Sequence, residues 1–119
     1  MDYDSFVKYT DLSDNNLQFY IDGMMEENGE ICGIFKRVRR GDYGETAKQE
    51  IETKGLKYII MNNENIRDDL IKEIGDRHWY STRLLQEIDC SWGDVEVINM
   101  EKLQDRKMRN TIMGKGDNR

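Results

Sequence analysis

The apolar residues of this 119-residue chain fall into short groups, and glycine or asparagine separates each group from the next. In the clearest group, apolar residues recur every three or four positions and Gly75 follows, which predicts an amphipathic helix over residues 64–74. The same spacing, with a polar capping sequence at its start and Gly29 at its end, predicts a helix over residues 13–28. A more polar segment with apolar residues four apart predicts a short helix over residues 45–54.

Other groups contain β-branched residues or alternate apolar with polar residues, and both patterns are typical of strands. They predict strands over residues 3–9, 30–38, 56–61 and 94–99, of which the first is the weakest. Residues 76–88 predict another helix, with an extended conformation of residues 79–85 as the alternative, and residues 100–113 predict a frayed final helix. Strands that alternate with helices indicate an α+β fold, in which helices pack on a small three- or four-stranded sheet.

The length of the chain and the lack of repeats or linkers indicate one domain that covers residues 1–119. Residues 104–119 form a polar segment that we expect to be mobile or ordered by a partner. No segment approaches the roughly 20 apolar residues of a membrane-spanning helix, and the N-terminus lacks the pattern of a secretory signal. We therefore expect a cytoplasmic protein that does not act at a membrane.

Few residues in this sequence point to metal or catalytic chemistry. The single histidine and the two distant cysteines give no familiar metal-ligand spacing, and the glycine-containing segments lack the other residues of a phosphate-binding loop. His78 lies near an acid and a hydroxyl, but adjacent residues seldom form the hydrogen-bonded chain that nucleophilic catalysis requires. Cys90 follows an acid, the opposite of the basic surroundings that activate a thiol. We expect no catalytic residue, no metal, no cofactor and no enzymatic activity.

The charge of the chain is acidic, with a formal net charge of -6, and two basic segments interrupt it. Residues Lys36–Arg40 carry four basic side chains, which suit contact with phosphate, or alternatively a solvated strand end that nearby acids neutralise. In a strand these side chains would divide between two faces, which weakens a phosphate-binding interpretation. The second basic segment is C-terminal and comprises Lys102, Arg106, Lys107, Arg109, Lys115 and Arg119.

Acidic residues recur at helical spacing from position 64 onward, and this pattern carries the functional interpretation. The residues are Glu64, Asp68, Asp69, Glu73 and Asp76. Carboxylates three or four residues apart on a helix are neighbours, so we expect a negative ridge on its exposed face, with an ordinary solvated face as the alternative. Trp79 and Tyr80 follow, and both are residue types that anchor protein interfaces when they do not belong to the core.

These features predict a non-catalytic acidic binding protein. We expect a stoichiometric inhibitor or regulator that occludes a basic, nucleic-acid-handling surface of a larger host or target protein. The acidic ridge would contact that surface, with Trp79 or Tyr80 as an apolar anchor, and direct binding to nucleic acid is not expected. Small acidic inhibitors that phages and mobile elements encode would fit this description.

A second interpretation is a winged-helix regulator that binds DNA. Residues 64–74 and 76–88 would form a helix-turn-helix and residues 94–99 its wing, with Arg77 and Arg83 on the helix that enters the groove. The basic C-terminal segment would support this binding. The dense acids of the first helix argue against the interpretation, because they would lie across the phosphate backbone.

Overall fold

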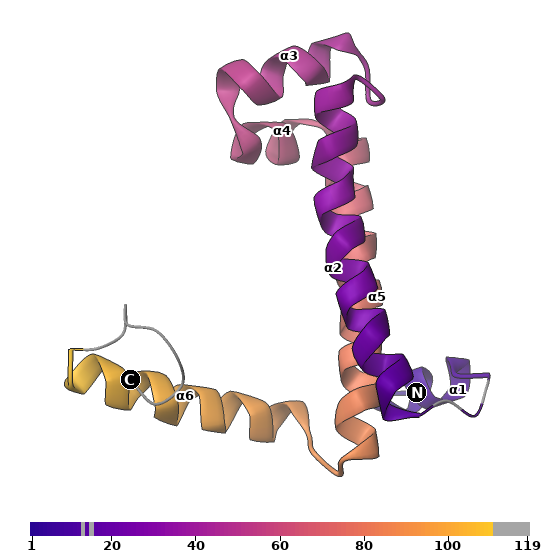
Figure 1. Cartoon of the computed structure of the whole chain (residues 1–119), viewed down its shortest axis with the longest axis vertical. Helices are drawn as coiled ribbons and strands as arrows, with labels where there is room; N and C mark the ends of the chain where they lie inside the picture. The colour runs from indigo at the N-terminus through magenta and orange to yellow at the C-terminus, as the bar shows by residue number, and fades with distance from the viewer. Residues whose placement is uncertain (13, 15, 111–119) are drawn as a thin grey trace. The chain divides into compact units, whose positions relative to one another are not determined.

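A computed structural model describes residues 1–12, 14 and 16–110 of the chain. The secondary structure of these residues is entirely helical, and no strand occurs among them (Figure 1). The helices are α1 (Tyr3–Thr10), α2 (Leu17–Arg40), α3 (Glu45–Lys54), α4 (Leu56–Asn62), α5 (Glu64–Glu87) and α6 (Trp92–Met108). The predicted α+β fold with a small sheet is therefore wrong.

Each of the four predicted strands lies in a helix. Residues 3–9 belong to α1, residues 30–38 to α2, residues 56–61 to α4 and residues 94–99 to α6. The apolar residues from position 31 to position 38 are also spaced by three or four, and a helix buries them better than a strand because they continue the apolar side of residues 20–28. Tertiary packing here overrides the strand preference of the β-branched residues.

Two glycines that were expected to end helices lie inside them. Gly29 is within α2 and Gly75 is within α5, so the expected helices 64–74 and 76–88 form one continuous helix. The structure also settles residues 79–85 as helical. The true end of α2 is Gly41, whose φ of 95° is left-handed and whose N–H donates to the carbonyl of Val38.

The remaining boundaries follow local capping chemistry. The prediction of a helix over residues 45–54 is confirmed by α3, which Gly55 ends with a φ of 91°. The side chain of Asn63 accepts a hydrogen bond from the N–H of Ile66 and so caps the start of α5. Ser13, the first residue of the helix expected over residues 13–28, lies outside the described residues, and Asn16 caps α2.

The chain divides into two compact units, Met1–Leu84 and Leu85–Arg119. In the first unit, α2 and α5 lie side by side and run in opposite directions, and α3 and α4 pack where α2 ends (Figure 1). The core of this region is the buried cluster of Ile34, Val38, Ala47, Ile51, Ile59 and Ile66. Because these side chains come from α2, α3, α4 and α5, they fix the four helices together at this end of the unit.

Two stripes of residues form what we call the seam of α2 and α5, and these helices meet where Tyr80 lies against Gly23 and where Glu27 approaches Glu73. Their spacing of four and three residues is that of helices packed in coiled coils. The stripe on α2 comprises Tyr20, Met24, Glu27, Ile31, Ile34 and Val38, and the stripe on α5 comprises Ile66, Leu70, Glu73, Arg77, Tyr80 and Leu84. Acidic residues therefore interrupt both stripes at the middle of the helix pair.

A second group of contacts joins α1 to the other end of the helix pair. Asp11 accepts a hydrogen bond at 2.8 Å from Nε of Arg83 and another at 2.5 Å from the hydroxyl of Tyr20. The indole N–H of Trp79 donates to the hydroxyl of Thr10 at 2.8 Å. The charged pair has little exposed surface, so these bonds lie in surroundings where they are strong.

The second unit contains α6, which Ser91 caps. The hydroxyl of Ser91 accepts from the N–H of Asp94, and the Asp94 carboxylate accepts from the N–H of Ser91, both at 3.0 Å. This capping box starts a helix where alternating residues had predicted a strand. Residues 104–108 of the expected tail are helical, and residues 111–119, which include the end of the expected final helix, lie outside the described part of the chain. None of the described helices has the length and apolar character that crossing a membrane requires.

Candidate partner-binding site

The acidic residues that were predicted to form one ridge on α5 divide between two sides of that helix. Successive residues of an α-helix are about 100° apart around its axis, so Glu64 and Asp68 lie roughly 40° from each other. Asp69, Glu73 and Asp76 lie together roughly 130° away from that pair on average. Glu64, Asp68 and Asp76 are exposed, whereas Asp69 and Glu73 are half-buried. The structure thus does not assemble the five carboxylates into a single outward surface.

Asp69 has a structural contact with the segment between α2 and α3. Its carboxylate accepts a hydrogen bond from the hydroxyl of Tyr43 at 2.5 Å. Burial raises the pKa of the Tyr43 phenol, and the bond to the Asp69 carboxylate raises it further. Asp69 therefore holds the end of α2 against α5 and is not free for a partner.

Glu73 and Asp76 meet a third carboxylate, that of Glu27 on α2. One carboxylate oxygen from each of the three residues lies within 4.8 Å of the others. Burial raises the pKa of Glu27 to about 7, helped by a hydrogen bond with Glu73 and by the negative charge of Asp76. Within the described part of the chain, no lysine or arginine forms a salt bridge with any of the three.

A small hollow beside these carboxylates brings acidic and aromatic side chains together. It has a volume of about 380 Å³, and we call it the acidic pocket; its lining residues are Glu27, Asp76, Trp79 and Tyr80. The rings of Trp79 and Tyr80 meet edge to face with centroids 5.2 Å apart, and the bond from Trp79 to Thr10 fixes the indole. Three of the predicted partner-binding residues, Asp76, Trp79 and Tyr80, thus line one pocket.

The sequence analysis missed Glu27, although a signal for it exists. Position 27 continues the spacing of four and three residues that starts at Tyr20 and ends at Val38, and it is the acidic member of that stripe. A carboxylate at a position that otherwise holds apolar residues is unusual and indicates a specific role.

The three carboxylates do not by themselves define a metal site. Calcium and magnesium bind six or more oxygen atoms, and three monodentate carboxylates supply at most half of that number. The remaining lining of the acidic pocket consists of the aromatic rings of Trp79 and Tyr80. We assign no metal here. An arginine or lysine side chain matches this lining better, because carboxylates bind its charge and aromatic rings contact both its charge and its methylene groups.

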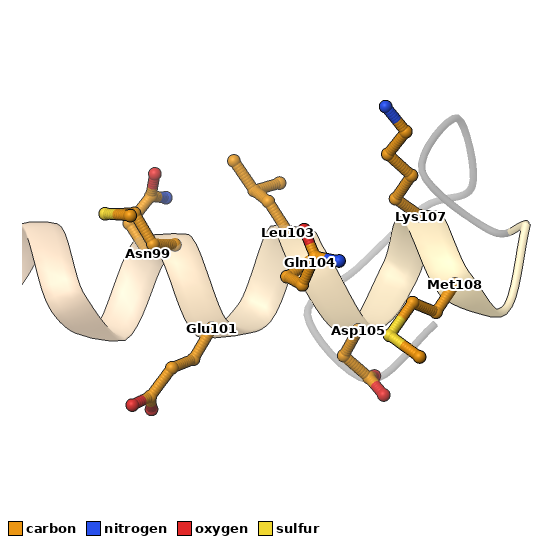
Figure 2. A pocket seen from close by; sticks show the side chains of 8 residues that line it. Asn99, Glu101, Leu103, Gln104, Asp105, Lys107 and Met108 are labelled. Carbon is orange, nitrogen blue, oxygen red and sulfur yellow. The ribbon is translucent and has the colours of Figure 1, made fainter.

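A second surface depression lies along α6 and has a volume of about 680 Å³. Figure 2 shows that Leu103 and Lys107 point to one side of the helix, while Glu101 and Asp105 point to the other. Polar groups that diverge in this way cannot act together on one ligand atom. We therefore do not treat this surface as a site of chemistry.

Side chains of both basic segments form ion pairs with nearby acids. At the end of α2, Arg40 pairs with Asp42, and Arg39 lies 3.9 Å from a carboxylate oxygen of Glu52. At the end of α6, Arg109 forms a salt bridge with Asp105 at 2.8 Å, while Lys115 and Arg119 lie outside the described residues.

The winged-helix architecture is wrong for this chain. It needs a turn near Gly75 and a strand at residues 94–99, but α5 continues through Gly75 and the second segment belongs to α6. Arg83, one of the residues expected to face DNA, is bonded to Asp11 with little exposed surface.

These observations define the class of the protein: a small helical protein whose long antiparallel helix pair carries an acidic pocket. The chain is 35% identical over 103 residues to the "Gene 37 protein" of Mycobacterium phage L5, a match that covers 87% of this chain and 76% of the phage protein. The chain belongs to the family of this phage protein, which confirms the expected link to phages. Neither a protein-family model nor a solved structure matches the chain.

Proposed function

We propose that the chain is a non-catalytic binding protein that occludes a basic surface of a larger, nucleic-acid-handling protein. The acidic pocket, rather than a ridge along α5, is the centre of the proposed contact. A lysine or arginine side chain of the partner would enter between the carboxylates of Glu27 and Asp76 and contact the rings of Trp79 and Tyr80.

The observation that carries this proposal is the group of three carboxylates without a salt bridge within the described residues. Gathering like charges in a half-buried place costs free energy, and a basic partner would recover that cost. The net charge of -6 adds a long-range attraction that speeds encounter with a basic surface. Because buried aromatic anchors with nearby charges dominate many interfaces, the fixed rings beside the carboxylates suit this role.

The test compares two exposed aspartates on the same helix. Asp76→Lys reverses a charge in the acidic pocket, whereas Asp68→Lys reverses a charge on the other side of α5. A partner is first captured from a bacterial lysate with the unmodified chain, and the Kd of each variant for the purified partner is then measured by titration calorimetry. We expect Asp76→Lys to weaken binding by at least tenfold, which corresponds to about 1.4 kcal/mol, and Asp68→Lys to change it less than about threefold.

Salt dependence separates this contact from an apolar one. The Kd of the unmodified chain should rise steeply between low and high salt, because screening weakens contacts between exposed charges. Equal losses of affinity for the two variants would contradict a role for the acidic pocket and would leave only a general effect of net charge.

A further inference from the structure

The seam between α2 and α5 is well packed at its ends and weakly packed at its middle. Tyr20, Ile34 and Val38 are completely buried, whereas the intervening seam residues of α2 are only half-buried. On α5, Ile66 is completely buried and Arg77 is exposed, while Glu73 is half-buried, as are Tyr80 and Leu84 at the other end of the seam. Apolar burial therefore holds the two ends of the helix pair together and contributes little between them.

At this weak middle, the side chains that meet across the seam are two carboxylates. Glu27 and Glu73 occupy seam positions of α2 and α5, and a carboxylate oxygen of one lies within 4.8 Å of a carboxylate oxygen of the other. Two ionised carboxylates this close repel each other, whereas one proton held between them removes the repulsion and allows a hydrogen bond. Close approach of these two side chains is therefore more favourable when they hold one proton between them.

The basic seam residue Arg77 is exposed and forms no salt bridge with Glu27 or Glu73 among the described residues. Glu26 on α2 and Asp76 on α5 act on Glu27 with further negative charge, and no lysine, arginine or histidine does so among the described residues. The other titratable groups nearby are the phenols of Tyr80 on α5 and of Tyr3 on α1, which the charge of Asp76 reaches. These carboxyl and phenol groups supply no positive charge to the pair.

We propose that Glu27 and Glu73 form a pH-sensitive joint in the helix pair: a shared proton joins the middle of α2 to α5, and loss of that proton loosens it. The joint is a property of the free protein and does not depend on the function proposed above. The buried ends of the seam keep the two helices paired while the middle opens.

The sign of the pH dependence follows from proton linkage. Burial and the neighbouring carboxylates raise the pKa of Glu27 from 4.5 to about 7, so the folded chain binds more protons than the unfolded chain between these values. The free energy of unfolding therefore falls as pH rises from about 4.5 to 7. Above pH 7 the stability that the proton on Glu27 contributes is fully lost. Paired carboxylates with a lowered pKa would give the opposite trend.

The test uses the whole chain and follows thermal unfolding by circular dichroism at pH 5.5 and pH 7.5. The unmodified protein should have the higher Tm at pH 5.5, by several degrees. In Glu73→Gln an amide keeps a hydrogen bond to Glu27 without needing the shared proton, so Tm at pH 7.5 should rise and the difference between the two pH values should shrink at least by half. Asp68→Asn removes an exposed carboxylate from the same helix and should leave that difference unchanged.

Amide hydrogen exchange then locates the effect. After correction for intrinsic rates, protection of residues 24–31 and 70–77 should fall between pH 5.5 and pH 7.5, while protection of residues 47–59 in the core should not. If Glu73→Gln does not fold, Glu27→Gln serves as the same test from the other helix. A Tm that rises with pH, a Glu→Gln variant that keeps the full pH difference, or a loss of protection spread evenly over the unit would overturn the proposal.

Discussion

Gly23 of α2 lies directly against the ring of Tyr80 on α5. A Cβ atom built on Gly23 would lie 2.3 Å from two ring carbons of Tyr80, which is well inside van der Waals contact. In contrast, a Cβ atom on Gly29 in the same helix would meet nothing within 4 Å. One glycine of α2 is therefore required by packing, and the other only weakens the helix.

This contrast gives a matched pair of substitutions. Gly23→Ala should lower the free energy of unfolding by about 1–3 kcal/mol, because the ring of Tyr80 must shift away from the seam. Gly29→Ala should raise it by about 0.5–1 kcal/mol, since alanine favours the helix at an open position. Urea unfolding monitored by circular dichroism measures both changes, and equal effects at the two positions would show that Tyr80 does not pack against Gly23.

At the scale of the elements, spacing and capping proved more informative than residue preference. The 3–4 spacing of apolar residues predicted α3, the first half of α2 and most of α5. The strand predictions relied on β-branched residues in short segments, where helix and strand preferences are close. Gly29 and Gly75 were treated as ends, but a glycine inside a helix costs only about 1 kcal/mol, which the apolar contacts on both sides of it exceed.

The start of α6 tests the importance of capping directly. Ser91→Ala removes the acceptor for the N–H of Asp94 and should destabilise the first turn of α6 by about 1 kcal/mol. Faster amide exchange at residues 93–97 by NMR measures the loss. Glu96→Gln changes an exposed charge in the same turn without touching the cap, and it should leave exchange there nearly unchanged.

At the scale of the whole molecule, the two units differ in what stabilises them. The buried apolar residues of the described chain all lie in the unit Met1–Leu84, and they are Val7, Tyr20, Ile34, Val38, Ala47, Ile51, Ile59 and Ile66. In α6 the single residue in the buried class is Arg106, and Ile98 and Met100 are more than 60% exposed. Burial of apolar surface is the main favourable contribution to folding. We therefore expect it to stabilise the first unit more than the second.

This difference predicts uneven protection from hydrogen exchange. Amides of α6 should exchange at least tenfold faster than amides at residues 34–38 and 47–59, because few buried contacts oppose local opening of that helix. Exchange measured by mass spectrometry on the intact chain resolves the two regions. Uniform protection across both units would show that α6 is stabilised as strongly as the core.

Part of the acidic pocket could be predicted from the sequence. The residue types of Asp76, Trp79 and Tyr80 indicated a contact surface, and the structure brings these three together. Glu27 lies nearly fifty residues away, and no local pattern relates it to Asp76. The prediction of a ridge along α5 was wrong because Asp69 accepts a hydrogen bond from Tyr43 and the Glu73 carboxylate lies near Glu27 of α2. Such contacts form only when the helices pack against each other.

By itself the sequence determined the acidic character of the chain, the apolar spacing that forms its helices, and the caps and glycines that end several of them. These properties depend on residues that are neighbours along the chain, so they can be inferred without a fold. Only the tertiary structure decided which helices continue through glycine and which carboxylates meet. Both outcomes depend on contacts between α2 and α5 that lie far apart in sequence, and the free energy of burying the seam decides them.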